Sequence, residues 1–448
     1  MDRERDTQRA RELTADLGAR GVRTVALTWV DNAGITRVKA VPVTRLEHAA
    51  AWGVGMSPVF DVYCLDDSVT TSRHIGGPAG DLRLYPDLDQ LVPLHAQPGW
   101  AWAPAVRLTQ ENEPYPGCQR SFATGMVERG HVADLDMRMA FEVEWFVGAL
   151  DLTPACSGPA YGMTRIVELS RYADDLLAAL AAQGVPVEQF HPEYAPGQLE
   201  VSVAATDPVA AADRLILVRQ TIRAVSQAHG HVVSFAPVVV AGQVGNGGHL
   251  HLSAWSQARN LFADGVGPYG LTARGESILA GLLQRLPALC AIGAPSPASY
   301  LRLVPQRWAG PWQCWGRENR EAALRLVTGT VGERSDAANA ELKCFDGAAN
   351  PYLLVGAVAA VAVATVDAGL RLPAEVPGDP ALLPEADRPP RLPQRLLEAL
   401  AALRDDDVLP QALGDPLLEA FCAVRVAEDE MFADADPPAI AEATRWKY

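Results

Sequence analysis

The sequence predicts an α+β protein in which a small, sheet-rich N-terminal domain precedes a larger domain of helices and strands. Residues 24–41 read as two strands on either side of a turn, which is the signal of a β-hairpin. Beyond residues 111–117, which are rich in turn-forming residues, long helical patterns alternate with short strand patterns. We therefore expect one domain at residues 1–112 and a second at residues 113–448.

The first domain should contain two helices and four strands. A charged segment with helical spacing ends at Gly21, and the turn at residues 31–34 carries a glycine where a hairpin favours one. Residues 52–80 are rich in Gly, Ser and Asp and should be irregular. The expected elements are helices at 6–20 and 44–51 and strands at 24–30, 35–41, 81–87 and 100–108.

Helix signals dominate the second domain. Thr164, Asp207 and Asn350 are candidate N-caps of three long helices, each with a glycine just past its end. The helix after Asn350 is apolar on all sides, which predicts burial. The expected elements are helices at 164–183, 208–229 and 351–368, a Pro-rich loop at 373–393, and helices at 394–404 and 412–430.

Composition limits the classes of function. The chain has 448 residues, of which 49% are hydrophobic and 21% charged, as in an ordinary globular protein. A net charge of −16 argues against binding to a nucleic-acid backbone and fits a protein that collects divalent cations. The longest apolar run, residues 353–366, is short for a membrane span. Seven scattered cysteines and a charged N-terminus favour a cytoplasmic protein.

Two acids share one face of the strand predicted at residues 141–146. Because side chains alternate along a strand, Glu142 and Glu144 point to one side, and Phe141, Val143 and Trp145 point to the other. Two such carboxylates lie about 7 Å apart, which suits two neighbouring cations better than a single one. The alternative is an ordinary antiparallel strand with one solvated polar face.

Further candidate metal ligands follow on strand-like segments. Glu193 and Glu200 flank a Pro-Gly turn, although surface carboxylates beside a loop would look the same. His249 and His251 repeat the two-residue spacing behind a glycine-rich stretch, and Glu341 alternates with a lysine. Carboxylates combined with an imidazole suit Mg²⁺ or Mn²⁺.

Arginines are concentrated near these acids in the sequence. Arg302, Arg317, Arg320 and Arg325 lie close together in a chain that is short of cations. Guanidinium groups bind carboxylate and phosphate oxygens through paired hydrogen bonds. The alternative is a charged helix face that pairs with its own glutamates. Divalent metals with arginines favour phosphoryl transfer, and because the chain has no P-loop motif, ATP would be bound in another way.

The ordered set of motifs resembles the glutamine synthetase superfamily over nearly the whole chain. The resemblance implies an N-terminal β-grasp domain followed by a glutamine-synthetase-like catalytic domain. It also implies a dodecamer of two hexameric rings with active sites between subunits. The matching motifs are E-V-E at 142–144, E-Y-A-P-G-Q-L-E at 193–200, N-G-G-H-L-H-L-S at 246–253, R-L-V-P at 302–305, R-E-N-R at 317–320, Glu341, and D-G-A-A-N-P-Y-L at 346–353.

The same resemblance implies a role for each matching residue in an ATP-dependent ligase. Glutamate would be activated as γ-glutamyl phosphate, and an amine would then displace the phosphate. One of at least two Mg²⁺ or Mn²⁺ ions would be held by Glu144, Glu193 and Glu200, and another by Glu142, His249 and Glu341. The remaining implied contacts are Arg302, Gly245, His249 and Lys343 with the substrate, Arg320 and Arg325 with the transferring phosphoryl group, and Glu188, His251 and Ser253 with the nucleotide.

Departures from the family pattern concern the amine. Trp308 stands where ammonia-using members carry a glutamate, and it could wall a pocket for a substituted amine. Asp61 is the expected equivalent of the ammonium-binding acid although the motif around it differs, and Asn339 and Lys343 replace two arginines. We therefore expect a ligase that joins glutamate to an organic amine such as ethanolamine or a polyamine. Alternatives are an ammonia-using glutamine synthetase, a ligase for another acid, and a family member without catalysis.

Overall fold

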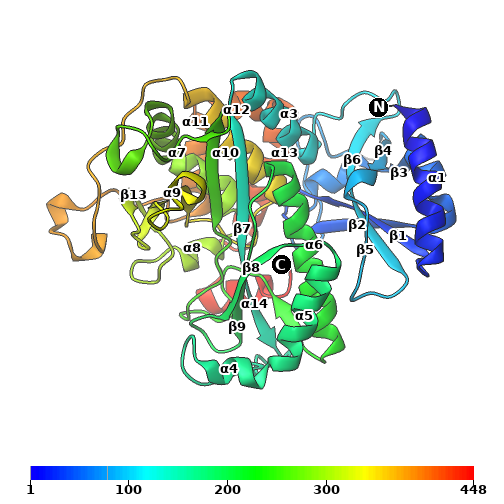
Figure 1. Cartoon of the computed structure of the whole chain (residues 1–448), viewed down its shortest axis with the longest axis horizontal. Coiled ribbons are helices and arrows are strands. Elements are labelled where there is room, and N and C mark those ends of the chain that lie inside the picture. The colour runs from blue at the N-terminus through cyan, green and yellow to red at the C-terminus, as the bar shows by residue number, and fades with distance from the viewer. Residues whose placement is uncertain (1, 78) are drawn as a thin grey trace.

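A computed structural model describes residues 2–77 and 79–448, and it has the α+β architecture predicted from the sequence (Figure 1). The N-terminal sheet lies to the right in this view, and the larger second domain lies to the left. In the N-terminal sheet, β1 (Thr24–Val30) pairs antiparallel with β2 (Thr36–Pro42) and parallel with β6 (Trp100–Thr109). The predicted hairpin is therefore confirmed.

The other N-terminal elements complete this sheet and cover it. The strand order is β2-β1-β6-β4-β3, and β5 pairs with β6. Residues 52–80, expected to be irregular, contain a three-residue strand and a short 3-10 helix at Pro58–Val62, both too short to give a periodic pattern. The bounds are α1 Arg3–Ala19, α2 Leu46–Trp52, β3 Val54–Met56, β4 Leu82–Pro86 and β5 Val92–Pro93.

A nine-stranded sheet forms the centre of the second domain. Its main path is β13 (Trp312–Arg317), β14 (Ala322–Val327), β15 (Asn339–Leu342), β11 (Leu250–Ser256), β7 (Asp136–Gly148), β9 (Gln198–Val203) and β8 (Val187–Pro192). Strand β10 (Val232–Ser234) pairs with β7, and β12 (Arg259–Asn260) pairs with β11. The segment with Arg317 and Arg325 thus forms strands, so the alternative of a charged helix face is wrong.

Helices pack around this sheet and around one another (Figure 1). None of the helices in the described part of the chain is long and apolar enough to cross a membrane. Their bounds are α3 Gln119–Val132, α4 Met163–Glu168, α5 Ser170–Ala182, α6 Pro208–Ala228, α7 Ala273–Gly293, α8 Ser299–Arg302, α9 Arg334–Ala337, α10 Pro351–Thr365, α11 Leu396–Asp405, α12 Leu409–Leu413, α13 Asp415–Met431 and α14 Pro437–Thr444.

Two of the predicted caps are confirmed and one is wrong. The side chains of Asp207 and Asn350 accept backbone hydrogen bonds at the start of α6 and α10, and α10 is buried along nearly its whole length. The helix expected at residues 164–183 is instead two helices, because Leu169 leaves helical geometry at φ −104° and ψ 16°. Gly162, which has no side-chain cap, precedes the first of them in place of Thr164.

Strand β7 supports the candidate site from below. Phe141, Val143 and Trp145 are 4%, 2% and 0% exposed and belong to the main hydrophobic core. Glu142 and Glu144 alternate with them on the other face, as the period of a strand requires. The core side of the strand therefore fixes the direction in which the two carboxylates point.

Candidate active site

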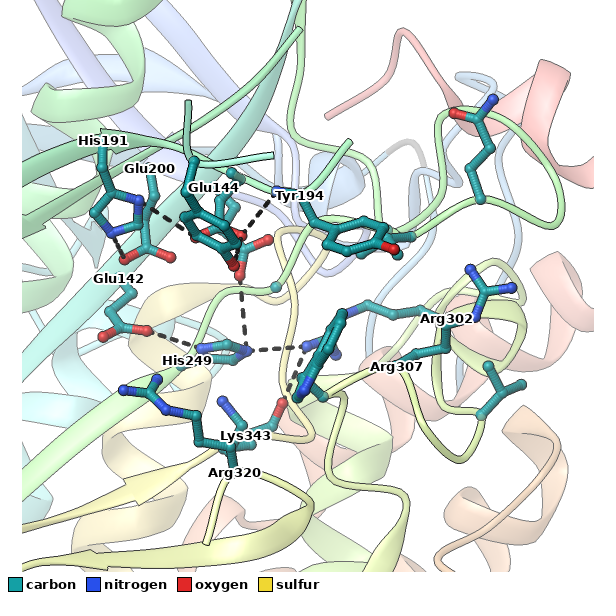
Figure 2. Close-up of a pocket in the computed structure, with 18 of the residues that line it drawn as sticks. Glu142, Glu144, His191, Tyr194, Glu200, His249, Arg302, Arg307, Arg320 and Lys343 are labelled. Atoms are coloured by element: carbon teal, nitrogen blue, oxygen red, sulfur yellow. Dashed lines mark hydrogen bonds and ion pairs between the residues drawn. The ribbon is translucent and has the colours of Figure 1, made fainter. Parts of the chain in front are cut away.

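A cavity of about 540 Å³ opens above the middle of the nine-stranded sheet (Figure 2). Eleven of the predicted site residues line it: Glu142, Glu144, Glu193, Glu200, Gly245, His249, Arg302, Trp308, Arg320, Arg325 and Lys343. In Figure 2, Glu144 and Glu200 lie above His249, whereas Arg320 and Lys343 lie below it. Acidic and basic groups thus gather in one cavity from segments that are far apart in the sequence.

Strand register explains how these acids meet. In the antiparallel pairing of β7 with β9, Glu144 lies directly opposite Glu200. In the pairing of β8 with β9, His191 also lies opposite Glu200. Because residues that face each other across a ladder share one side of the sheet, the three side chains form a row over the cavity. On the other side of β7, His251 lies opposite Glu341 between β11 and β15.

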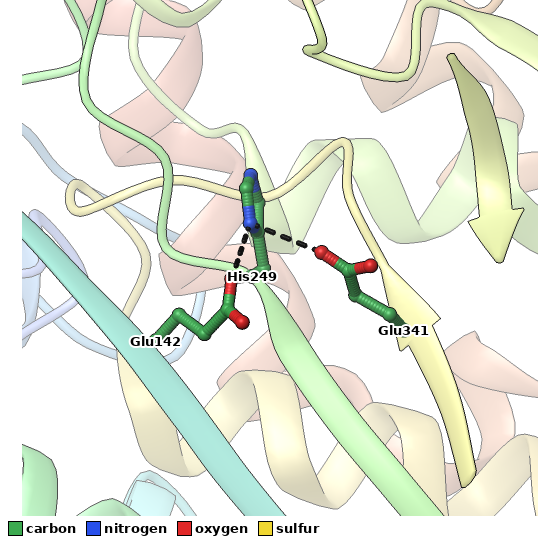
Figure 3. Close-up of side chains that lie close together, drawn as sticks. All are labelled: Glu142, His249 and Glu341. Carbon is green, nitrogen blue, oxygen red and sulfur yellow. Dashed lines mark hydrogen bonds and ion pairs between the residues drawn. The ribbon is translucent and has the colours of Figure 1, made fainter. Parts of the chain in front are cut away.

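The first candidate metal cluster consists of Glu142, His249 and Glu341 (Figure 3). Nδ1 of His249 lies 2.8 Å from Oε2 of Glu142 and 3.2 Å from Oε1 of Glu341. Burial would lower the pKa of His249, but hydrogen bonds to the two carboxylates outweigh this effect and raise it to about 9. One atom from each residue lies within 4.8 Å of the others, so one divalent cation fits between them.

The second cluster consists of His191, Glu193 and Glu200. The two ring nitrogens of His191 lie 3.3 Å from Oε1 of Glu193 and 3.3 Å from Oε1 of Glu200. Sequence reasoning missed His191, although it stands two residues before Glu193, the same strand spacing as His249 and His251. Glu144, expected in this set, lies beside it and accepts a 2.9 Å hydrogen bond from Nε2 of Gln198.

The concentration of carboxylates fits a second cation. Burial raises the pKa of Glu200 to about 7, and the charges of Glu142, Glu144 and Glu193 add to the shift, against the hydrogen bond from His191. Carboxylates crowded in this way repel one another unless a cation neutralises them. The oxygen-rich donor set with imidazole suits Mg²⁺ or Mn²⁺. The residues present therefore fit the two divalent ions expected from the sequence.

Basic groups form the opposite side of the cavity. Arg302 is 5% exposed, and its Nη2 atom donates to the backbone oxygen of Lys343 at 3.1 Å. Its Nη1 atom is buried without a hydrogen-bond partner in the described part of the chain. Arg325 pairs with Glu341 at 3.0 Å, and Lys343 pairs with the same carboxylate at 2.9 Å. A free, buried guanidinium donor beside a cavity favours an anionic substrate group.

Aromatic rings border the mouth of the cavity. Trp308 is 44% exposed, and its ring lies 5.2 Å from that of Tyr194 at an angle of 52°. Tyr161 also lines the cavity and donates a 2.8 Å hydrogen bond to Oε2 of Glu193. An indole ring cannot accept a proton from ammonium, but rings of this kind can cover an alkyl chain and attract an organic cation.

The structure places Asp61 outside the lining of this cavity. This side chain is 0% exposed inside the N-terminal domain, where Nη1 of Arg107 lies 2.7 and 2.8 Å from its two oxygens. Tyr115 donates a further hydrogen bond of 2.9 Å. Asp61 is therefore held by side chains of its own chain, and its contact with the amine, which the resemblance places at a site between subunits, remains a prediction.

Three predicted nucleotide contacts lie outside the cavity lining. Glu188 is exposed on β8 beside an irregularity in the ladder, and Gln189 lines the cavity instead. His251 lies just beneath, with Nε2 at 3.2 Å from Glu142. The hydroxyl of Ser253 accepts a hydrogen bond from the indole of Trp255 at 2.9 Å. Their contacts with a nucleotide remain predictions.

Comparisons with known proteins agree with this architecture. Family models described as the glutamine synthetase N-terminal domain and the glutamine synthetase catalytic domain match residues 12–112 and 116–442. The chain is 55% identical over 456 residues to Gamma-glutamylpolyamine synthetase GlnA3 of Streptomyces coelicolor, covering 99% of this chain and 97% of that protein. It is 27% identical to Type-1 glutamine synthetase 1 of Dictyostelium discoideum, covering 92% of this chain and 86% of that one.

Solved structures give the same result. A crystal structure described as a novel glutamine synthase homolog superimposes with a TM-score of 0.86 at 32% identity, covering 95% of this chain and 99% of the other. An ADP complex of GmaS superimposes with a TM-score of 0.83 at 26% identity, covering 95% and 97%. The similarity therefore extends over both domains.

Proposed function

Because the chain belongs to the glutamine synthetase family, we propose that it is an ATP-dependent ligase that joins the γ-carboxylate of glutamate to an organic amine. The reaction would pass through γ-glutamyl phosphate, from which the amine displaces phosphate. The observation that supports an organic amine is the aromatic border of Trp308 and Tyr194 beside the carboxylate clusters. The 55% identity to a protein named for polyamine substrates supports the same reading.

Two divalent cations would be bound by the carboxylates of the cavity. Glu142, His249 and Glu341 would hold one, and Glu193 and Glu200, with Glu144 or His191, would hold the other. When bound, such ions neutralise phosphate oxygens and orient them for transfer. The strand register and the hydrophobic core beneath the sheet keep these ligands in place before substrate arrives.

The basic side of the cavity would bind glutamate and the transferring phosphoryl group. Arg302, with its free Nη1 donor, would hold the α-carboxylate of glutamate, and the backbone of Gly245 would line the same pocket. Arg320 and Arg325 would neutralise charge on the phosphoryl group as it moves. Lys343 keeps a positive charge beside Glu341 but lacks the fork of an arginine.

Trp308, Tyr194 and Tyr161 would enclose the amine. The rings cover its alkyl chain and exclude water from the acyl phosphate, while the carboxylates attract its protonated end. This arrangement favours a mono- or polyamine over ammonia. We also propose that the enzyme works in the cytoplasm as a dodecamer of two hexameric rings, as the family resemblance implies.

A phosphate-release assay with glutamate, ATP and Mg²⁺ tests the proposal. Ammonium, ethanolamine, putrescine and spermidine are compared at several concentrations, and the amide product is identified by mass spectrometry. We expect kcat/KM to be highest for an organic amine. A higher kcat/KM for ammonium than for every organic amine would contradict the proposal, and a lack of turnover with every amine would support a non-catalytic role.

A further inference from the structure

A second cavity, of about 410 Å³, lies between the two domains and shares no lining residue with the candidate active site. Strands β1, β2 and β6 of the N-terminal sheet form one wall, and α6 with residues 446–448 forms the other. The charged side chains of the lining are Arg219, Arg223 and Lys447, and no Asp or Glu is among them. An all-basic cavity is unexpected in a chain with a net charge of −16.

The two arginines are held side by side on α6. They are four residues apart, so they occupy the same face of the helix. Their Cζ atoms lie 5.3 Å and 5.0 Å from the centroid of the Phe235 ring. Both guanidinium groups are therefore stacked on one aromatic side chain and fixed in direction.

Neither arginine has the carboxylate partner that a charge shielded from water usually has. Among the described residues, neither has a carboxylate within 4.0 Å, and Nε of Arg219 is buried without a hydrogen-bond partner. Burial and the charge of Arg223 lower the pKa of Arg219 to about 10, although Asp346 offsets part of this effect. Arg219 thus stays charged at neutral pH. Two adjacent guanidinium groups with unpaired donors lower the stability of the fold, and a bound anion would offset this cost.

Three tryptophans stand out in the rest of the lining, which also contains threonine and glutamine side chains. Trp100, Trp102 and Trp446 border the cavity, and Trp100 is 38% exposed. Gln220 donates a 3.1 Å hydrogen bond to Gln97 on the cavity wall. Indole rings provide a surface for an aromatic or aliphatic group next to the guanidinium pair. The lining therefore combines an oxyanion site with an apolar surface.

We infer that this cavity binds a small organic anion, with a carboxylate or phosphate on Arg219 and Arg223 and an apolar body against the tryptophans. Guanidinium forks bind either oxyanion through paired hydrogen bonds. Because both domains line the cavity, the ligand would contact both of them at once. This cavity shares no residue with the candidate active site, so anion binding here can be tested independently of the amide-forming activity.

Isothermal titration calorimetry on the intact protein tests this site. A saturating, non-hydrolysable ATP analogue with Mg²⁺ occupies the active site, and the probes are phenyl phosphate, benzoate, inorganic phosphate and benzyl alcohol. We expect phenyl phosphate or benzoate to bind. The affinities of these two probes then show whether the site prefers a phosphate or a carboxylate. The double variant Arg219→Gln, Arg223→Gln should bind at least about tenfold more weakly, since it loses the charge-assisted hydrogen bonds of both guanidinium groups. Arg214→Gln is the matched control, because Arg214 lies on the same helix outside this cavity.

Four results would overturn the inference. They are the absence of binding by every probe, equal binding by the double variant, loss of binding when the ATP analogue is present, and equal binding of inorganic phosphate and phenyl phosphate. A double Arg→Lys variant at residues 219 and 223 retains charge without the fork and should show an intermediate affinity. Without ligand, the Arg219→Gln, Arg223→Gln protein should melt at or above the wild-type temperature. A lower Tm would mean that the arginines serve packing.

Discussion

Replacing Trp308 by alanine should impair the use of organic amines selectively. Each fully buried methylene contributes about 0.8 kcal/mol. Trp308 is 44% exposed and packs near Tyr194, so the two rings would cover one side of a bound amine chain. Putrescine has four methylenes. If the variant loses about half of their burial energy, transition-state binding weakens by about 1.6 kcal/mol and kcat/KM for putrescine falls about 15-fold. Ammonium has no methylene, so its kcat/KM should stay within about twofold.

Phosphate release measured with putrescine and with ammonium, both at saturating glutamate and ATP, provides the comparison. Trp52→Ala is the matched control, because Trp52 is 52% exposed on α2 in the N-terminal domain. Equal losses with both substrates would mean that Trp308 supports the site in general. An unchanged KM for putrescine would show that the ring does not contact the amine.

Three further substitutions test other parts of the structure. Asp61→Asn breaks a buried ion pair with Arg107 and should lower the free energy of unfolding by about 3–5 kcal/mol in urea titrations, with little change in kcat of the folded enzyme. His191→Asn should raise the Mg²⁺ concentration for half-maximal activity by about 10-fold or more. Burial raises the pKa of Glu428 to about 7, so ionisation costs stability as pH rises from about 4 to about 7. The Tm of Glu428→Gln relative to that of the wild type should therefore rise with pH across this range, while the altered 2.9 Å contact with Arg425 sets the starting difference.

Each of these expectations has an opposite outcome. A stable Asp61→Asn protein with a strongly reduced kcat would support a catalytic role for Asp61. An unchanged Mg²⁺ requirement would remove His191 from the metal site. A Tm difference between Glu428→Gln and wild type that does not vary with pH would show that the carboxyl group does not titrate in this range.

Local patterns predicted the parts of the site that a single segment determines. The period of two along residues 141–146 was sufficient to place Glu142 and Glu144 on one face, because the alternate residues are core residues. The row of Glu144, Glu200 and His191 depends on two strand pairings. The 144–200 pairing joins segments more than fifty residues apart, so only the register of the folded sheet reveals the row.

Asp61 shows contacts that a local pattern cannot predict. The segment around it resembles a family motif, but its partner Arg107 lies on β6, far from it in the sequence. One nitrogen of Arg107, Nη1, donates to both oxygens of Asp61, and Tyr115 donates to one of them. Glu188 was predicted from the same family resemblance. It lies beside an irregularity in the β8 ladder, and the next residue, Gln189, lines the cavity.

The loop that carries Trp308 needs support, because two of its non-glycine residues adopt left-handed backbone conformations. Gln306 has φ 60° and Trp308 has φ 54°, and each such residue costs about 1–3 kcal/mol. Both backbone amides donate to one carboxylate, that of Glu321, at 3.3 Å and 2.9 Å. Glu321 is 9% exposed, so water replaces these hydrogen bonds poorly.

Glu321→Ala should therefore release the loop and act on the amine through Trp308. We expect KM for putrescine to rise by about 5- to 15-fold, toward the value of Trp308→Ala, while KM for ATP stays within about twofold. Glu321→Gln keeps an acceptor oxygen and should be milder. If Glu321→Ala and Trp308→Ala are combined, the second change should add little, because both remove the same contact. Additive effects would mean that Glu321 does not act by holding Trp308 in place.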